Sequence, residues 1–219
     1  MSELLDTIEV ETGPAPRAAI IWLHGLGADG HDFEPIVPEL SLPPATAVRF
    51  VFPHAPIQAV TINGGARMRA WYDIGHDGRQ DAAGIRASQS RVEALIARER
   101  GRGVAAHRIV LAGFSQGGAI ALQTGLRHPD PLAGVLALST YLPLADTLEK
   151  EASAAARDVP IFMAHGVEDP LIPLARAAQS RDRLSALGYR VEWHEYPMPH
   201  SVCAEEIRDI GVWLQRTLG

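Results

Sequence analysis

Five short apolar runs, rich in valine and isoleucine, constrain the fold of this chain most strongly. They lie at residues 18–25, 47–56, 108–113, 134–139 and 159–166. Apolar residues follow one another almost continuously in these runs, which is typical of strands covered on both faces. Helical patterns lie between and after them, at 85–100, 116–127, 174–187 and 203–218. Strands that alternate with helices predict an α/β fold with a mostly parallel central sheet and helices on both faces.

Some segments differ from this rhythm. Residues 4–10 alternate loosely, as an antiparallel edge strand does, and residues 189–197 alternate more clearly. The basic run at 98–103 is interpreted as a solvated helix end that leads into a turn. Residues 53–74 contain prolines, Asn-Gly-Gly and no sustained period, and long loops of this kind are often functional. Three apolar side chains of this segment, those of Trp71, Tyr72 and Ile74, could line a pocket or could fill the core.

Composition limits the classes of protein to which the chain can belong. Its 219 residues, 47% of them hydrophobic, suffice for one sizeable core, so we expect a single domain over residues 1–219. A formal net charge of −6 offers nothing that attracts nucleic acid or an anionic membrane surface. Cys203 is the only cysteine, and the N-terminus carries acids where a signal peptide carries basic residues. No apolar run approaches the roughly 18 residues of a membrane-spanning helix. We therefore expect a cytoplasmic protein with no integral membrane segment.

Residues 113–118, Gly-Phe-Ser-Gln-Gly-Gly, match the G-x-S-x-G nucleophile elbow. In this motif a strand turns sharply into a helix and exposes a serine hydroxyl. A strand pattern precedes the stretch and a helical pattern follows it, which is the context that the motif requires. A phosphate-binding loop is the alternative, but such loops need either Lys followed by Ser or Thr, or G-x-G-x-x-G. Neither is present, so Ser115 is predicted to be a nucleophile.

A serine nucleophile needs a histidine base and an acid that orients the base. With this elbow the chain order is serine, acid, histidine. Asp169 follows a later strand in a proline-punctuated loop, at the end of the sheet where α/β folds place their sites, and Glu168 is its closest competitor. Of nine histidines, only His194 and His200 follow Asp169. His194 lies within a strand pattern as an ordinary exposed side chain, whereas His200 lies in the loop before the last helix. The predicted triad is therefore Ser115, Asp169 and His200.

Acyl transfer also needs N–H donors for the negative oxygen of the tetrahedral intermediate. The glycine-rich loop that follows the first buried run can turn N–H groups inward, and in this fold the residue after the nucleophile, Gln116, supplies a second donor. His24 and His165 each precede a glycine at a strand end and are interpreted as structural turn residues. No pair of histidines has ligand spacing and the cysteine stands alone, so we expect neither a metal site nor a cofactor.

Five motifs in order, LHGLGADG, NGG leading into MRAWYDI, GFSQGG, HGVEDPLIP and PHSVCAEE, make the chain resemble a known family over nearly its whole length. It is similar to the carboxylesterase and acyl-protein thioesterase family of α/β-hydrolases. The resemblance implies an α/β-hydrolase fold without a lid domain and the same three triad residues. It also implies that the backbone N–H groups of Leu26 and Gln116 form the oxyanion hole.

The resemblance further implies a shallow apolar channel for an acyl chain beside the serine. The substrate-binding positions that it implies are Leu26, Ile74, Tyr141 and Leu171. Tyr141 stands where the thioesterase branch often carries Trp, which leaves the preferred chain length open. Trp71 is then expected to support the pocket wall, and Cys203 to be a buried, inert thiol. Homodimers are compatible with the resemblance.

Three hypotheses for the function follow. The first is a serine carboxylesterase that hydrolyses short- to medium-chain acyl esters through an acyl-enzyme on Ser115. The alternative shares this mechanism but acts as an acyl-protein thioesterase or a lysophospholipase. The remote alternative is a non-catalytic binding protein that kept the fold, because fold alone does not determine function.

Overall fold

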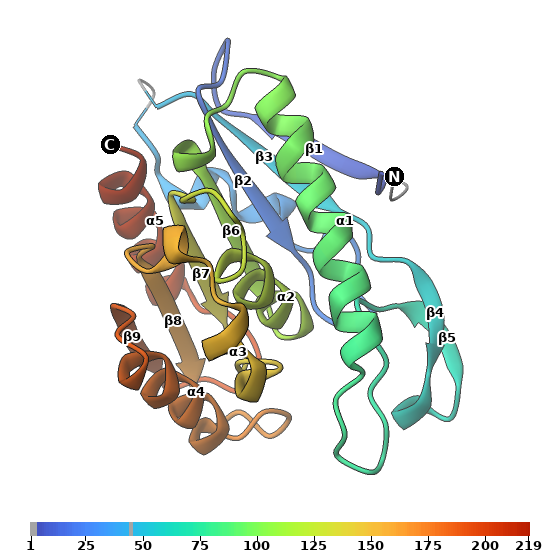
Figure 1. The fold of residues 1–219 in the computed structure, drawn as a ribbon. Coiled ribbons are helices and arrows are strands. Elements are labelled where there is room, and N and C mark those ends of the chain that lie inside the picture. Colours follow the sequence, from blue (N-terminus) through green and yellow to red (C-terminus); the bar gives the residue numbers. More distant parts are fainter. Residues whose placement is uncertain (1–3, 44–45) are drawn as a thin grey trace.

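The computed structural model describes residues 4–43 and 46–219. Within them, seven strands form one sheet in the order β1-β3-β2-β6-β7-β8-β9 (Figure 1). Their bounds are β1 Thr7–Glu11, β2 Ala18–Leu23, β3 Val48–Pro53, β6 Ile109–Phe114, β7 Gly134–Leu138, β8 Ile161–Gly166 and β9 Val191–Tyr196. β1 pairs antiparallel with β3, and the other neighbours are parallel. The mostly parallel sheet, the antiparallel edge strand near the N-terminus and the late strand are thus confirmed.

Helices cover both faces of the sheet, as predicted. Their bounds are α1 Ala82–Gly101, α2 Gln116–Gly125, α3 Ala145–Glu151, α4 Leu174–Ala186 and α5 Ala204–Leu218. Helices α1 to α4 lie on one face of the sheet and α5 lies on the other (Figure 1). Buried side chains of α1 to α4 share one apolar cluster, whereas those of α5 belong to a second cluster. Two short 3-10 turns, Glu34–Ile36 and Pro38–Leu40, lie beside α5 on that second face.

Strand β2 shows why the apolar runs are almost continuous. Ala19, Ile21 and Leu23 belong to the cluster under α1 to α4. The alternate residues, which are Ala18, Ile20 and Trp22, belong to the cluster under α5. Successive side chains of a strand point to opposite faces, so a strand that is covered on both faces must be apolar at every position.

One helix and one hairpin were not predicted. Helix α3 follows β7, and residues 53–74 contain a hairpin of β4 Ile57–Val60 and β5 Ala66–Arg69 rather than irregular chain alone. Gly64 and Gly65, with φ of +65° and +79°, supply the left-handed backbone near the hairpin turn. Most hairpin side chains are exposed or half-buried, so no continuous face imposes a period on the sequence.

The basic run at the end of α1 is more than a solvated helix end. Glu99 within it is fully buried, and its carboxylate oxygens lie 2.8 Å from Arg49 Nη1 and 3.1 Å from both Arg98 Nη2 and Arg102 Nη1. A buried charge must be paired, and these arginines pair it.

Among the residues that the structure describes, no helix combines the length and apolarity needed to cross a membrane.

The C-terminal ends of four neighbouring parallel strands lie along one edge of the sheet. The register pairs Leu23 of β2 with Gly113 of β6, and Phe114 of β6 with Leu138 of β7. Leu138 in turn pairs with Ala164 of β8. The segments that follow these strands, including Ser115, therefore lie next to one another, although the first begins at His24 and the last at Val167.

Candidate active site

The elbow at Ser115 is built from a strained backbone. Ser115 has φ of +53° and ψ of −119°, directly between β6 and α2. Residues other than glycine rarely adopt positive φ, and such strain concentrates at functional sites. The surrounding structure fixes this conformation, since the Ser115 N–H donates to Leu138 O at 2.8 Å and Thr140 Oγ1 donates to Ser115 O at 2.6 Å.

The glycines on either side of the elbow permit close approach of the backbone. A Cβ at Gly113 would overlap the backbone of Gly117, and a Cβ at Gly117 would overlap the carbonyl groups of Leu23 and His24. The strand, the following helix and the end of β2 are therefore closer together here than any side chain allows.

Asp169 and His200 meet at the same edge of the sheet. Asp169 follows β8 and His200 follows β9, and Asp169 Oδ2 lies 2.6 Å from His200 Nδ1. Asp169 Oδ1 accepts hydrogen bonds from the N–H groups of Leu171 and Ile172, each at 2.9 Å. Burial alone would raise the pKa of Asp169, but the hydrogen bonds from His200 and from the two backbone groups lower it below its ordinary value. Asp169 is thus an ionised carboxylate at neutral pH.

His200 packs beside the residue that precedes the nucleophile. Its ring centroid lies 4.7 Å from that of Phe114. Because Nδ1 faces Asp169, Nε2 is the nitrogen left to exchange a proton with a substrate or a nucleophile.

Neither competing residue reaches this pair. Glu168 is exposed, and its N–H donates to Met198 O. His194 lies within β9, half-buried between the rings of Phe162 and Tyr196, with Nε2 3.2 Å from Glu192 Oε1. The expectation of an ordinary exposed His194 was wrong, because α5 covers this face of the edge strand.

Several backbone N–H groups near Ser115 lack an acceptor. Among the residues that the structure describes, the N–H groups of Leu26 and Gln116 donate to no protein atom, and neither do those of Gly117 and Gly118 in the first turn of α2. The loop of Leu26 lies against the elbow, since a Cβ on Gly25 would stand 3.6 Å from Ser115 Cβ. The first N–H groups of a helix have no partner within the helix, so that of Gln116 is open to water or a ligand, as is that of Leu26.

The side chain of Gln116 was missed as a structural element of the site. Its Oε1 accepts the Trp71 N–H at 2.7 Å, and its Nε2 donates to Tyr72 O at 2.7 Å. Trp71 is buried, and its indole N–H donates to His24 O at 2.8 Å. Trp71 therefore occupies a supporting position. No local pattern marks these bonds, because they join residues about 45 positions apart.

The four residues predicted to bind substrate differ in their surroundings. Leu26 and Ile74 are half-buried, whereas Leu171, two residues after Asp169, is 71% exposed. Tyr141 is half-buried, its hydroxyl lies 2.8 Å from that of Tyr72, and the guanidinium of Arg176 lies 3.6 Å from its ring centroid. One face of the Tyr141 ring is thus covered by a cation, and the substrate-binding roles stay predictions.

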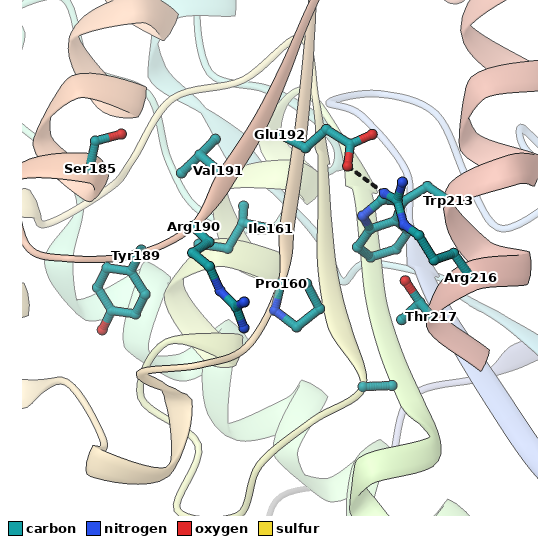
Figure 2. A pocket seen from close by; sticks show the side chains of 11 residues that line it. Pro160, Ile161, Ser185, Tyr189, Arg190, Val191, Glu192, Trp213, Arg216 and Thr217 are labelled. Atoms are coloured by element: carbon teal, nitrogen blue, oxygen red, sulfur yellow. Dashed lines mark hydrogen bonds and ion pairs between the residues drawn. The ribbon is translucent and has the colours of Figure 1, made fainter. Parts of the chain in front are cut away.

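A hollow of about 800 Å³ lies at the opposite end of β8 and β9 (Figure 2). Pro160 and Ile161 at the start of β8 line it, together with Arg190 and Val191 at the start of β9. Trp213 of α5 closes one side. The hollow contains none of the predicted site residues, because those follow the other ends of the strands.

Two remaining expectations concern metals and the cysteine. Across residues 4–43 and 46–219, no three or more His, Cys, Asp or Glu side chains cluster as metal ligands. Cys203 is a free thiol directly before α5, and it is half-buried rather than buried as expected.

Comparisons with known proteins place this geometry in a family. The model of the phospholipase/carboxylesterase family matches residues 6–218. An acyl-protein thioesterase 1 of Mycosarcoma maydis is 40% identical, over 96% of this chain and 95% of that protein. One of Yarrowia lipolytica is 38% identical, over 96% of each chain.

Solved structures agree. SOBER1 of Arabidopsis thaliana, at 30% identity, superposes with a TM-score of 0.88 and covers 93% of this chain and 100% of its own. Acyl-protein thioesterase 2 of Zea mays, at 29% identity, gives a TM-score of 0.86 over 98% of this chain and 99% of its own. This chain has the α/β-hydrolase fold, and it belongs to the phospholipase/carboxylesterase family of serine hydrolases.

Proposed function

We propose that this protein hydrolyses acyl thioesters and esters through the triad Ser115, Asp169 and His200. The observation that carries the proposal is the 2.6 Å contact between Asp169 and His200 beside a strained serine. The backbone N–H groups of Leu26 and Gln116, which have no protein acceptor among the described residues, support it as an oxyanion hole.

The reaction would proceed in two halves. His200 Nε2 takes the proton of Ser115 Oγ as the oxygen attacks the acyl carbonyl carbon, and Asp169 holds the imidazole and stabilises its charge. The N–H groups of Leu26 and Gln116 bind the oxyanion. His200 then protonates the leaving thiolate or alkoxide, which forms the acyl-enzyme. Water, deprotonated by His200, attacks the acyl carbonyl and releases the carboxylic acid and Ser115.

For the substrate class, the relatives favour the thioesterase alternative over a short-chain carboxylesterase. Those at 38% to 40% identity over nearly the whole chain are named acyl-protein thioesterases. We therefore propose acyl thioesters of proteins as the preferred substrates.

The test of the chemistry is the Ser115→Ala variant. We expect kcat on a p-nitrophenyl acyl ester to fall by a factor on the order of 10⁵ to 10⁶, because nucleophile and base act as one unit. A fluorophosphonate probe should label the wild type and not this variant. Ser185→Ala is the matched control, since it makes the same change at an exposed position of α4 and should keep full activity. Full turnover by Ser115→Ala would refute the triad, and a folded wild type that the probe never labels would favour a non-catalytic binding protein.

The substrate class requires a separate measurement. The values of kcat/KM should be compared for S-palmitoylated peptide, lysophosphatidylcholine and p-nitrophenyl esters of about two to sixteen carbons, since specificity is a ratio of such values. We expect the peptide thioester to be preferred. Preference for a two- to eight-carbon ester would instead support the short- to medium-chain carboxylesterase.

A further inference from the structure

His24 lies buried between two segments beside the candidate oxyanion hole. It directly follows β2 and is only 2% exposed. Its Nδ1 lies 2.7 Å from Gly25 O, and its Nε2 lies 3.0 Å from the backbone N of Ala55. Both ring nitrogens are therefore engaged by backbone atoms, and neither faces the triad.

These two partners determine the protonation of the ring. A carbonyl oxygen can only accept a hydrogen bond and a backbone N–H can only donate one. Nδ1 must therefore carry the proton, and Nε2 must present its lone pair to Ala55. Burial lowers the pKa of His24 to about 4, and a second proton on Nε2 would oppose the Ala55 N–H. The ring is neutral with one fixed tautomer at neutral pH, which excludes a role in proton transfer.

The hydrogen bond from Nδ1 acts on the peptide unit that carries one oxyanion donor. Gly25 C=O and Leu26 N–H belong to the same peptide unit, and a planar trans peptide directs these two groups oppositely. The described chain has no cis peptide bonds. The Ala28 N–H also donates to Gly25 O, at 3.3 Å. With Gly25 O held on the side of His24, the Leu26 N–H points away from the ring.

The second donor is tied to the same histidine. The indole N–H of Trp71 donates to His24 O at 2.8 Å, and the Trp71 backbone N–H donates to Gln116 Oε1 at 2.7 Å. A buried chain of hydrogen bonds thus links the residue before the Leu26 loop to the residue after the nucleophile. This chain of hydrogen bonds restrains the position of the Leu26 loop relative to the start of α2.

We propose that His24 is a positioning residue whose Nδ1–H sets the plane of the Gly25–Leu26 peptide and so aims the Leu26 N–H at the oxyanion. The inference rests on the proposed function, because it concerns how the Leu26 N–H of the proposed oxyanion hole is oriented. It goes beyond a structural turn residue, because rotation of this one peptide unit would remove a catalytic hydrogen bond without unfolding the loop.

Two variants separate the hydrogen bond from His24 Nδ1 to Gly25 O from the hydrogen bond that Nε2 accepts from the Ala55 N–H. The amide nitrogen of Asn is as many bonds from Cα as His Nδ1, so His24→Asn keeps a donor for Gly25 O and loses the acceptor for Ala55. The amide oxygen of Gln is as many bonds from Cα as His Nε2, so His24→Gln keeps the acceptor and loses the donor. We expect His24→Gln to lower kcat by about 10²-fold with KM changed less than about threefold, which is the loss expected for one oxyanion donor. We expect His24→Asn to stay within about tenfold of the wild type.

A trifluoromethyl ketone, which forms a tetrahedral adduct with the active serine, provides a second readout. Its inhibition constant should rise in His24→Gln by the same factor as kcat falls, at an unchanged melting temperature. Equal losses in both variants, or full activity of His24→Gln, would overturn the inference and would leave the proposed function intact if Ser115→Ala is still inactive. Failure of the proposed function would show instead as an inactive, unlabelled wild type.

A measurement on the wild type keeps the inference testable if a variant does not fold. Long-range ¹H–¹⁵N correlation spectra of the imidazoles report the tautomer and the pKa of each histidine. We expect His24 to be neutral, with its proton on Nδ1, from pH 5 to pH 8. A proton on Nε2, or titration near the ordinary histidine pKa of about 6.5, would overturn the inference.

Discussion

At the scale of single residues, two adjacent carboxylates have opposite surroundings. Asp169 is buried and accepts hydrogen bonds from His200 and from two backbone N–H groups, whereas Glu168 is exposed. The difference arises because the loop after β8 turns at this point, and one side chain faces the edge of the sheet while its neighbour faces solvent.

This pair of acids offers a direct comparison. Asp169→Asn should lower kcat by about 10⁴-fold with little loss of folding, because an amide can favour the wrong tautomer of His200. Glu168→Gln removes the same charge one residue away and should keep kcat within about twofold. The comparison is made by steady-state kinetics on one p-nitrophenyl ester. Equal losses in the two variants would exclude Asp169 as the orienting acid.

At the scale of elements, the elbow depends on how closely α2 approaches β2 and β6. Gly117 at the start of α2 lies against the carbonyl groups of Leu23 and His24, and Gly113 at the end of β6 lies against Gly117. The same close approach positions Gln116, whose side chain binds the loop of Trp71. The helix thus supports the nucleophile and the neighbouring loop together.

Gly117→Ala tests this close approach. The added Cβ would overlap backbone that cannot rotate away, so we expect a loss of about 2–3 kcal/mol or more in the free energy of unfolding, together with lower activity. Gly101→Ala is the matched control, since Gly101 ends α1 with no atom within 4 Å of the added carbon. It should stabilise the protein by up to about 1 kcal/mol. Urea unfolding measures both, and similar effects of the two substitutions would contradict the close approach.

At the scale of the whole molecule, one buried carboxyl couples stability to pH. Glu206 of α5 is fully buried, and neither of its oxygens has a well-formed hydrogen bond among the described residues. Burial raises the pKa of Glu206 from 4.5 to about 8. The N–H of Cys203 partly offsets this rise, and the carboxylate of Asp209 adds to it. The folded protein therefore binds this proton more tightly than the unfolded chain does, and stability falls as the pH rises from about 4.5 to about 8.

Glu206→Gln should remove this dependence, because the amide does not ionise. At pH 8.5 we expect the variant to have a higher melting temperature than the wild type and a free energy of unfolding larger by on the order of a few kcal/mol. At pH 5.5 this advantage should be lost. Glu205→Gln makes the same change at an exposed neighbour and should show no such slope. Thermal unfolding at several pH values between 5.5 and 8.5 measures the pH dependence of stability in each variant. A parallel pH dependence in Glu206→Gln and the wild type would contradict the assignment.

Much of the fold and the order of the candidate site follow from the sequence alone. Near-continuous apolar runs identified the strands that are buried on both faces, because each strand exposes alternate side chains to opposite layers. The elbow motif and the positions of Asp169 and His200 after later strands indicated one edge of a parallel sheet, since parallel strands end together. These are local patterns, and local patterns are what a sequence displays.

Only the tertiary structure decided which residues meet. The hairpin of β4 and β5 lacks a buried face and so carries no period, and the Gln116 side chain binds Trp71 across about 45 residues. Likewise, His24 appeared from sequence as a turn residue, and its two backbone partners became visible only when Ala55 was brought beside it. The physical reason is that a hydrogen bond between distant loops depends on the packing that positions both loops, which no local pattern encodes.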